Sequence, residues 1–99
     1  VLPPEPVEYA VEFTYYIRRA DQGSADTIQQ RVNDAVAEYV AWQRSKLGRD
    51  INPDELIARV KAAGAKRLVV DNPEFKTVER HEVAQETAVI INYGGVEDE

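Results

Sequence analysis

The chain has 99 residues, of which 43% are hydrophobic and 30% charged, with a formal net charge of −6 and no cysteine. This length allows one domain with one core, and the composition is that of a folded chain. The lack of cysteine excludes disulfides, thiolate metal sites and cysteine nucleophiles. The negative charge argues against nucleic acid as the main partner, because phosphate binding needs clustered Lys and Arg.

No apolar run approaches the roughly 20 residues that cross a bilayer, so we predict no membrane insertion. The first residues, 1–6, are rich in proline, which suits neither a helix interior nor a central strand. We interpret this segment as a linker from an upstream domain, and the lack of an initiator Met as the sign of a fragment. Residues 7–95 are expected to form one domain, and residues 96–99 an acidic tail.

Residues 7–18 alternate between two sets of side chains, which predicts a long strand. One face of this strand is apolar and consists of Val7, Tyr9, Val11, Phe13, Tyr15 and Ile17. The other face carries charged residues such as Glu8 and Glu12. This pattern is typical of an antiparallel sheet that is covered on one side.

Apolar residues then recur with the period of a helix, from about Ala25 to Leu47. Ser24 or Asp26 can cap the start of this helix, because their side chains accept hydrogen bonds from unpaired backbone N–H groups. Gly48 is placed to end it in a left-handed conformation. This helix would be the longest element of the domain.

A second, shorter helix is marked by local signals at both ends. Asn52 can act as the N-cap, and Pro53 suits the first turn. Glu55 stands where it would complete a capping box with Asn52. Gly64 would close the helix.

Three strands are expected after the helices. A short one spans Leu68–Val70, and a weaker one lies at about residues 76–80. The strong final strand covers residues 87–93 and stops at Gly94 and Gly95. The element order β-α-α-β-β-β predicts an α+β fold, a two-layer sandwich with two helices packed on one face of a three- to four-stranded, mostly antiparallel sheet.

The residue types that usually carry chemistry form no recognised pattern. His81 is the only histidine and stands among charged residues, which favours an exposed loop residue over a base or a ligand. Glu79, Glu82 and Glu86 lack the Asp, Asn and Gly at fixed offsets that cation loops use. We therefore predict no catalytic residue, no cofactor and no metal site, and a domain that is not an enzyme.

Two other classes of function stay open. A small acidic hydrolase or transferase would need two carboxylates converging in a cleft, and the acidic residues are spread too evenly to nominate a pair. A nucleic-acid-binding sheet would stack bases on aromatic side chains of the first strand. Those aromatic residues share their face with aliphatic ones, however, and Glu8 and Glu12 would repel phosphate.

The final strand is apolar on both faces, since Ala88, Ile90 and Asn92 alternate with Val89, Ile91 and Tyr93. Only one of these sets can meet the helices, so the other would expose aliphatic side chains unless loops or the linker cover it. Which of Ile90 and Ile91 points outward depends on the register. The candidate interface is Tyr16, Val69, Ile90, Ile91 and Tyr93.

Three segments resemble the C-terminal domain of the baseplate J-like proteins of contractile-tailed phages. They are Ala-Val-Ala-Glu-Tyr-Val at 35–40, Leu-Gly-Arg-Asp-Ile-Asn-Pro-Asp-Glu-Leu at 47–56, and Ala-Ala-Gly-Ala-Lys-Arg-Leu at 62–68. The resemblance runs from about Ser24 to the end of the chain, and the leading strand matches only in character. Ala65 stands where valine is more usual in the family.

The resemblance implies a structural, non-catalytic part of the baseplate wedge. Its partners would be other baseplate wedge proteins or further copies of itself. It would be located in the virion, at the tail baseplate, after synthesis in the cytoplasm of the bacterial host. The matching residues are explained by helix capping and packing, and none of them is a catalytic group.

Overall fold

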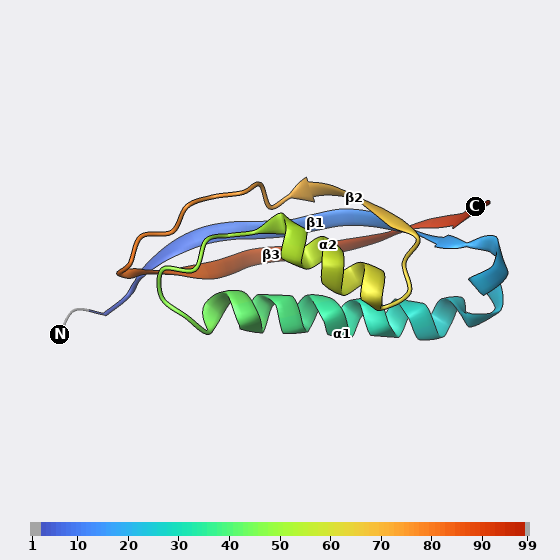
Figure 1. Cartoon of the computed structure of the whole chain (residues 1–99), viewed down its shortest axis with the longest axis horizontal. Helices are drawn as coiled ribbons and strands as arrows, with labels where there is room; N and C mark the ends of the chain where they lie inside the picture. Colours follow the sequence, from blue (N-terminus) through green and yellow to red (C-terminus); the bar gives the residue numbers. More distant parts are fainter. Residues whose placement is uncertain (1–2, 99) are drawn as a thin grey trace.

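A computed structural model describes residues 3–98 of the chain. The molecule is elongated, with extents of 53 × 19 × 18 Å. A sheet forms one layer and two α-helices form the other (Figure 1). In chain order the elements are β1 (Glu5–Arg18), a 3-10 helix η1 (Arg19–Ser24), α1 (Ala25–Arg44), α2 (Pro53–Ala62), β2 (Arg67–Asn72) and β3 (Glu82–Glu97).

The sheet has three strands in the order β2-β1-β3. The predicted α+β class with helices on one face is confirmed, and the sheet is mixed. β2 pairs with β1 antiparallel, from Glu12 to Tyr16 only, whereas β3 pairs with β1 in parallel along the whole of Glu5–Arg18. The sheet is therefore not mostly antiparallel, because the segment after β2 runs back along the molecule and lets β3 enter beside the start of β1 (Figure 1).

The prediction of a weak strand at residues 76–80 is wrong. Lys76 alone pairs, in an isolated antiparallel bridge with Ile51 whose two N–H···O bonds measure 2.9 and 3.1 Å. Val78 is buried, but its N–H donates to the Asp50 carboxylate at 2.9 Å rather than to a neighbouring strand. Residues 76–78 therefore form hydrogen bonds with the loop between the helices and do not pair with the sheet as a fourth strand.

Strands β1 and β3 are longer than their hydrophobic patterns indicate. β1 begins at Glu5, inside the predicted linker, and β3 continues to Glu97, inside the predicted acidic tail. Gly94 does not end β3. Its hydrogen lies beneath the Tyr16 ring, where a Cβ atom would stand 2.4 Å from the nearest ring carbon. The absence of a side chain at Gly94 thus allows the Tyr16 ring to pack directly against the backbone of β3.

The predicted glycine end of α2 is confirmed, since Gly64 has φ 122° and directly follows the C-cap Ala63. Gly48 has φ 71° but lies in the loop and does not end α1, so that prediction is wrong. Helix α1 itself stops at Arg44, slightly earlier than expected. Asn52 caps α2 by accepting the N–H of Asp54 at 3.0 Å. The capping box does not form, because the Glu55 carboxylate pairs with Arg59 at 3.0 Å.

The core lies between the sheet and the two helices. The odd-numbered side chains of β1 from Val7 to Ile17 are all buried, as the alternation predicts. They pack against a stripe from both helices that includes Ile28, Val32, Val36, Tyr39, Leu56 and Val60. Because each fully buried side chain of this size contributes roughly 1.5–3 kcal/mol, this layer supplies most of the stability.

One polar side chain, Gln43, is fully buried where α1 approaches the start of α2. Its amide NH2 donates to the Asp50 carbonyl at 3.0 Å, and its oxygen accepts the Asn52 N–H at 3.1 Å. The Tyr39 hydroxyl donates to the same oxygen at 3.2 Å. Gln43 therefore joins the end of the first helix to the cap of the second.

Candidate interaction surface

The face of the sheet opposite the helices carries three of the five residues in the candidate interface. Paired residues of adjacent strands point to the same side of a sheet. Ile90 is paired with Glu12, and Val69 with Thr14, so both share the outward face with Tyr16. Ile90 is 47% exposed and Val69 is 45% exposed. The register therefore identifies Ile90, and not Ile91, as the outward aliphatic residue.

The other two candidates lie on the helix side of β3. Ile91 is paired with Phe13 and packs partly buried against the core. Tyr93 is paired with Tyr15, with 5.4 Å between ring centroids, yet it is 45% exposed. This exposure arises because β3 is an edge strand. The structure thus separates the predicted set into an outward group and an edge group.

The edge group includes a residue that was not nominated from the sequence. Val89 is 44% exposed beside Ile91, and residues 87–93 contain no charged side chain. Two further exposed apolar residues, Phe75 at 61% and Leu47 at 48%, lie in loops. Loop residues show no periodicity, so no sequence signal could have found Phe75.

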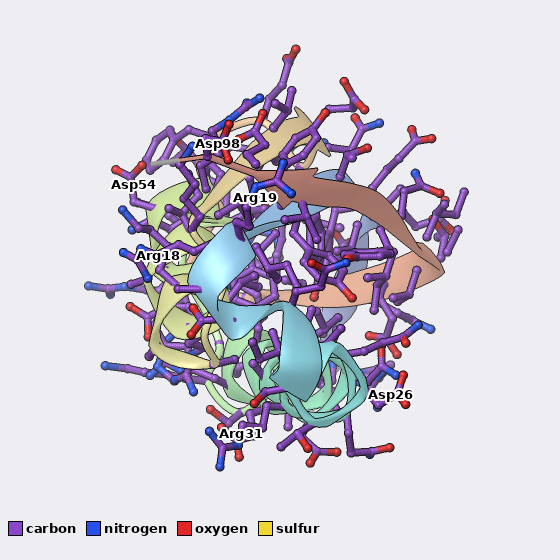
Figure 2. All side chains as sticks on the ribbon, turned by 90° about the vertical axis from the view of Figure 1, so that its right-hand side faces the viewer. Arg18, Arg19, Asp26, Arg31, Asp54 and Asp98 are labelled. Atoms are coloured by element: carbon purple, nitrogen blue, oxygen red, sulfur yellow. The ribbon has the colours of Figure 1, made fainter. Side chains whose placement is uncertain are left out.

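The C-terminal end of the sheet is held by ion pairs. The Glu97 carboxylate accepts two bonds from Arg67, at 2.8 and 2.7 Å, and one from Lys66 at 3.3 Å. The bond from Arg67, reinforced by Lys66, lowers the Glu97 pKa to about 2. Arg19 similarly contacts Asp98 at 2.5 Å, and Figure 2 shows these two side chains together at the end of the molecule.

Tyr16 is fixed in place by the same cluster. The Arg67 guanidinium lies 4.1 Å from the centroid of the Tyr16 ring, within the range of a cation–π contact. Gly94 lies under the ring on the neighbouring strand. The Tyr16 ring therefore packs between Arg67 and Gly94 at the border of the outward face.

A polar group is enclosed between β1, β3 and the end of α1. Glu86 on β3 forms an ion pair with Arg44. Burial, and then the nearby Glu86 charge, raise the pKa of Tyr9 to about 12, so the phenol stays protonated at neutral pH. The Tyr9 hydroxyl and Glu86 Oε2 have no hydrogen-bond partner. One carboxylate beside a protonated phenol does not make the acid–base pair that a hydrolase would need.

The lone histidine lies at the start of β3. His81 Nε2 is 3.5 Å from a Glu5 carboxylate oxygen, and both side chains are about two-thirds or more exposed, at 67% and 71%. Glu82 is close enough for the three residues to offer ligand atoms within 4.8 Å of one another. Its carboxylate, however, already accepts the Glu79 N–H at 2.8 Å. This exposed group is a surface contact between a histidine and neighbouring carboxylates.

Two of the hollows on the described surface are lined in part by carboxylates. One, of about 350 Å³, is beside β1. The other, of about 310 Å³, lies between the helices and includes Asp34 and Glu38. Glu38 contacts Arg59 at 3.8 Å and Asp34 accepts from Gln30 at 3.2 Å, so other side chains already engage both carboxylates.

No helix in the described part of the chain is long and apolar enough to cross a membrane.

Fold and surface together define the class of the protein: a two-layer α+β sandwich with helices on one face of its sheet and no helix on the other. The sequence matches the model of the Baseplate J-like protein C-terminal domain over residues 11–92, and the chain therefore belongs to this family. No curated protein sequence matches the chain. The family is one of structural proteins of the phage tail baseplate, typically without enzymatic activity, whose partners are proteins of the virion tail.

Proposed function

We propose that this domain is a non-catalytic assembly module of a contractile-tail baseplate and acts through protein–protein contacts of its bare sheet face. Ile90, about half exposed on a face that no helix covers, carries the proposal. Each Å² of apolar area left in water forgoes roughly 25 cal/mol, which a partner surface would recover. The partners are other baseplate wedge proteins or further copies of the domain, met after synthesis in the host cytoplasm.

The geometry of the outward face supports a contact that spans the whole sheet. Val69 on β2 and Ile90 on β3 lie on either side of β1, close to Thr14. Tyr16, held by Arg67 and Gly94, borders this stripe toward the C-terminal end. Ile91 and Tyr93 lie on the reverse side of the same edge strand and extend the contact around the edge. Apolar patches of this kind on a sheet usually mark contact sites.

Replacement of Ile90 by Lys tests the proposal. Because Ile90 is half exposed and points away from the core, Ile90→Lys should leave the melting temperature of the isolated domain within a few degrees of the original. In tail assembly it should block incorporation of the protein into tail particles, measured by sedimentation of assembled tails. The matched control is Gln29→Lys, the same new charge at an exposed residue of α1, away from the sheet.

Two outcomes would contradict the proposal. If Ile90→Lys unfolds the isolated domain, Ile90 belongs to the core and the contact idea fails. If the variant folds and joins tail particles as well as Gln29→Lys does, the outward apolar stripe has no role in assembly.

A further inference from the structure

One edge of β1 pairs with a neighbouring strand over only part of its length. The strand runs from Glu5 to Arg18 and pairs with β3 over this whole length. On its other side β2 pairs with it only from Glu12 to Tyr16. Within the described residues, the edge from residue 5 to residue 11 therefore has no strand beside it.

The segment that follows β2 turns away from this edge. Lys76 exchanges two hydrogen bonds with Ile51, and Val78 donates to Asp50, so residues 76–78 are held to the loop between the helices. A hollow of about 350 Å³ is left between them and β1. Its lining consists of Glu8, Tyr9, Ala10, Ile51, Asn72, Pro73, Glu74, Phe75 and Lys76.

The backbone of β1 presents hydrogen-bonding groups to this hollow. The Tyr16 carbonyl accepts the Lys66 N–H at 2.8 Å, so even-numbered residues of β1 direct their backbone groups toward the β2 side. The Tyr9 carbonyl instead accepts from Thr87 on β3. Glu8 and Ala10 therefore face the hollow, and no backbone hydrogen bond from the described chain reaches them there. Unpaired strand groups of this kind form a template for another strand.

The charge around the hollow is negative. Glu8 and Glu74 line it against the single cation Lys76, and neither carboxylate has an ion-pair partner among the described residues. Asp71 and Glu12 stand at the end where β2 stops. A segment that lies here would place alternate side chains next to these carboxylates, so Lys and Arg fit best.

We propose that this hollow is a docking slot for an extended, basic segment of a partner protein, which adds as a strand along the free edge of β1. The segment continues the line of β2, antiparallel to β1, and bonds to the backbone of Glu8 and Ala10. Its Lys or Arg side chains point to the Glu8 side, and its apolar side chains enter the hollow near Ile51. Main-chain bonds then supply affinity and the alternate side chains supply specificity. This contact deepens the proposed assembly role and lies apart from the outward stripe around Ile90.

Amide hydrogen exchange, followed by NMR on the isolated domain, tests the free edge first. The amides of Glu8 and Ala10 should exchange roughly tenfold or more faster than those of Tyr9 and Val11, which bond to β3. Addition of the peptide acetyl-Lys-Val-Lys-Val-Lys-amide should then slow the Glu8 and Ala10 amides and shift their resonances. The peptide acetyl-Glu-Val-Glu-Val-Glu-amide should have no effect at the same concentration.

Two variants separate charge from backbone pairing. Glu8→Lys should weaken binding of the lysine peptide roughly fivefold, whereas Glu38→Lys, the same change on the exposed surface of α1, should not. Ala10→Pro removes the N–H that faces the hollow and should abolish binding while the domain stays folded, because proline is tolerated at an unpaired edge.

The slot is disproved if the Glu8 and Ala10 amides are already protected in the free domain, since the edge would then be closed. It is also disproved if the two peptides bind alike, or if neither binds at millimolar concentration. Ile90→Lys distinguishes this slot from the proposed function, because that variant should still bind the lysine peptide. A failure of assembly in Ile90→Lys and a failure of peptide binding are therefore independent results.

Discussion

At the scale of single residues, the Tyr16 ring occupies the space that a side chain at Gly94 would fill. A Cβ atom at position 94 would stand 2.4 Å from the Tyr16 ring. Gly94→Ala should therefore lower the free energy of unfolding by about 1–3 kcal/mol, as overpacking does. Gly23→Ala is the control, because nothing lies within 4 Å of a Cβ atom there.

Denaturant unfolding measures this effect, and a double variant identifies its cause. Adding Gly94→Ala to Tyr16→Ala should cost little, since the ring that the new methyl group meets is gone. If Gly94→Ala is equally destabilising with and without Tyr16, backbone conformation and not the ring explains the glycine.

Glu97 provides a prediction about pH. Bonds from Arg67 and Lys66 lower its pKa from 4.5 to about 2, so the carboxylate binds protons more weakly in the folded domain than in the unfolded chain. The ion cluster therefore adds stability above about pH 4.5, and this contribution is lost as the pH falls toward 2. Glu97→Gln should be less stable than the original at pH 7 and nearly equal to it at pH 2.

Thermal unfolding across this pH range checks the sign. Glu38→Gln is the control, because Glu38 is 70% exposed and its contact with Arg59 is long, at 3.8 Å. A stability difference for Glu97→Gln that stays constant from pH 7 to pH 2 would show that the carboxylate charge is not involved.

At the scale of elements, Gln43 joins the two helices through bonds that no other side chain replaces. Gln43→Leu keeps the size of the side chain but leaves the Asn52 N–H and the Asp50 carbonyl without their partner. We expect a loss of about 2 kcal/mol in the free energy of unfolding, the cost of burying unsatisfied backbone groups. Gln29→Leu, on the exposed surface of the same helix, should change it by less than about 0.5 kcal/mol.

Equal stability of the two variants would contradict this prediction, because it would mean that water bonds to the Asn52 N–H and the Asp50 carbonyl in place of Gln43. Hydrogen exchange of the Asn52 amide provides a second readout. It should accelerate in Gln43→Leu before the rest of α2 is affected.

Elements with local signals could be predicted from the sequence, and those that depend on distant partners could not. Asn52, Pro53 and Gly64 define α2 because caps and glycine ends act within a few residues. The prediction of a mostly antiparallel sheet was wrong for β3, because alternation says which side chains share a face but not from which end a strand enters. The strand expected at residues 76–80 was wrong because Ile51, its partner, lies in the loop between the helices.

The candidate surface shows the same division. Alternation in the final strand separates two apolar sets, and the structure leaves residues of both exposed: Ile90 on the outward face, and Val89 and Tyr93 on the helix side. The face to which each set belongs follows from the pairing of Ile90 with Glu12, and pairing is a property of the whole sheet. The cluster around Glu97 joins residues about 30 positions apart, so no local pattern could indicate it.

At the scale of the whole molecule, the domain is one-sided. Both helices cover the same face of the sheet, so a 53 Å-long body has a packed side and a bare side (Figure 1). Its long edge strand, β3, carries no charged side chain between Glu86 and Glu97. Glu86 pairs with Arg44, and Glu97 pairs with Arg67. Soluble proteins usually protect such edges with charge, proline or bulges. The stretch at residues 87–93 has no charged residue and no proline, and the two irregularities in its pairing with β1 lie only at its ends, near Thr87 and Gly94.

We expect this edge to promote association of isolated domains at high concentration. Val89 is 44% exposed on β3, and its backbone groups face outward because those of Ile90 bond to β1. Val89→Lys should therefore reduce aggregation on heating at high concentration, measured by light scattering, while the melting temperature changes little. Leu47→Lys removes an equally exposed apolar side chain, 48%, from a loop and should leave aggregation unchanged. If both variants reduce aggregation equally, general surface hydrophobicity is responsible and the edge of β3 has no special part in it.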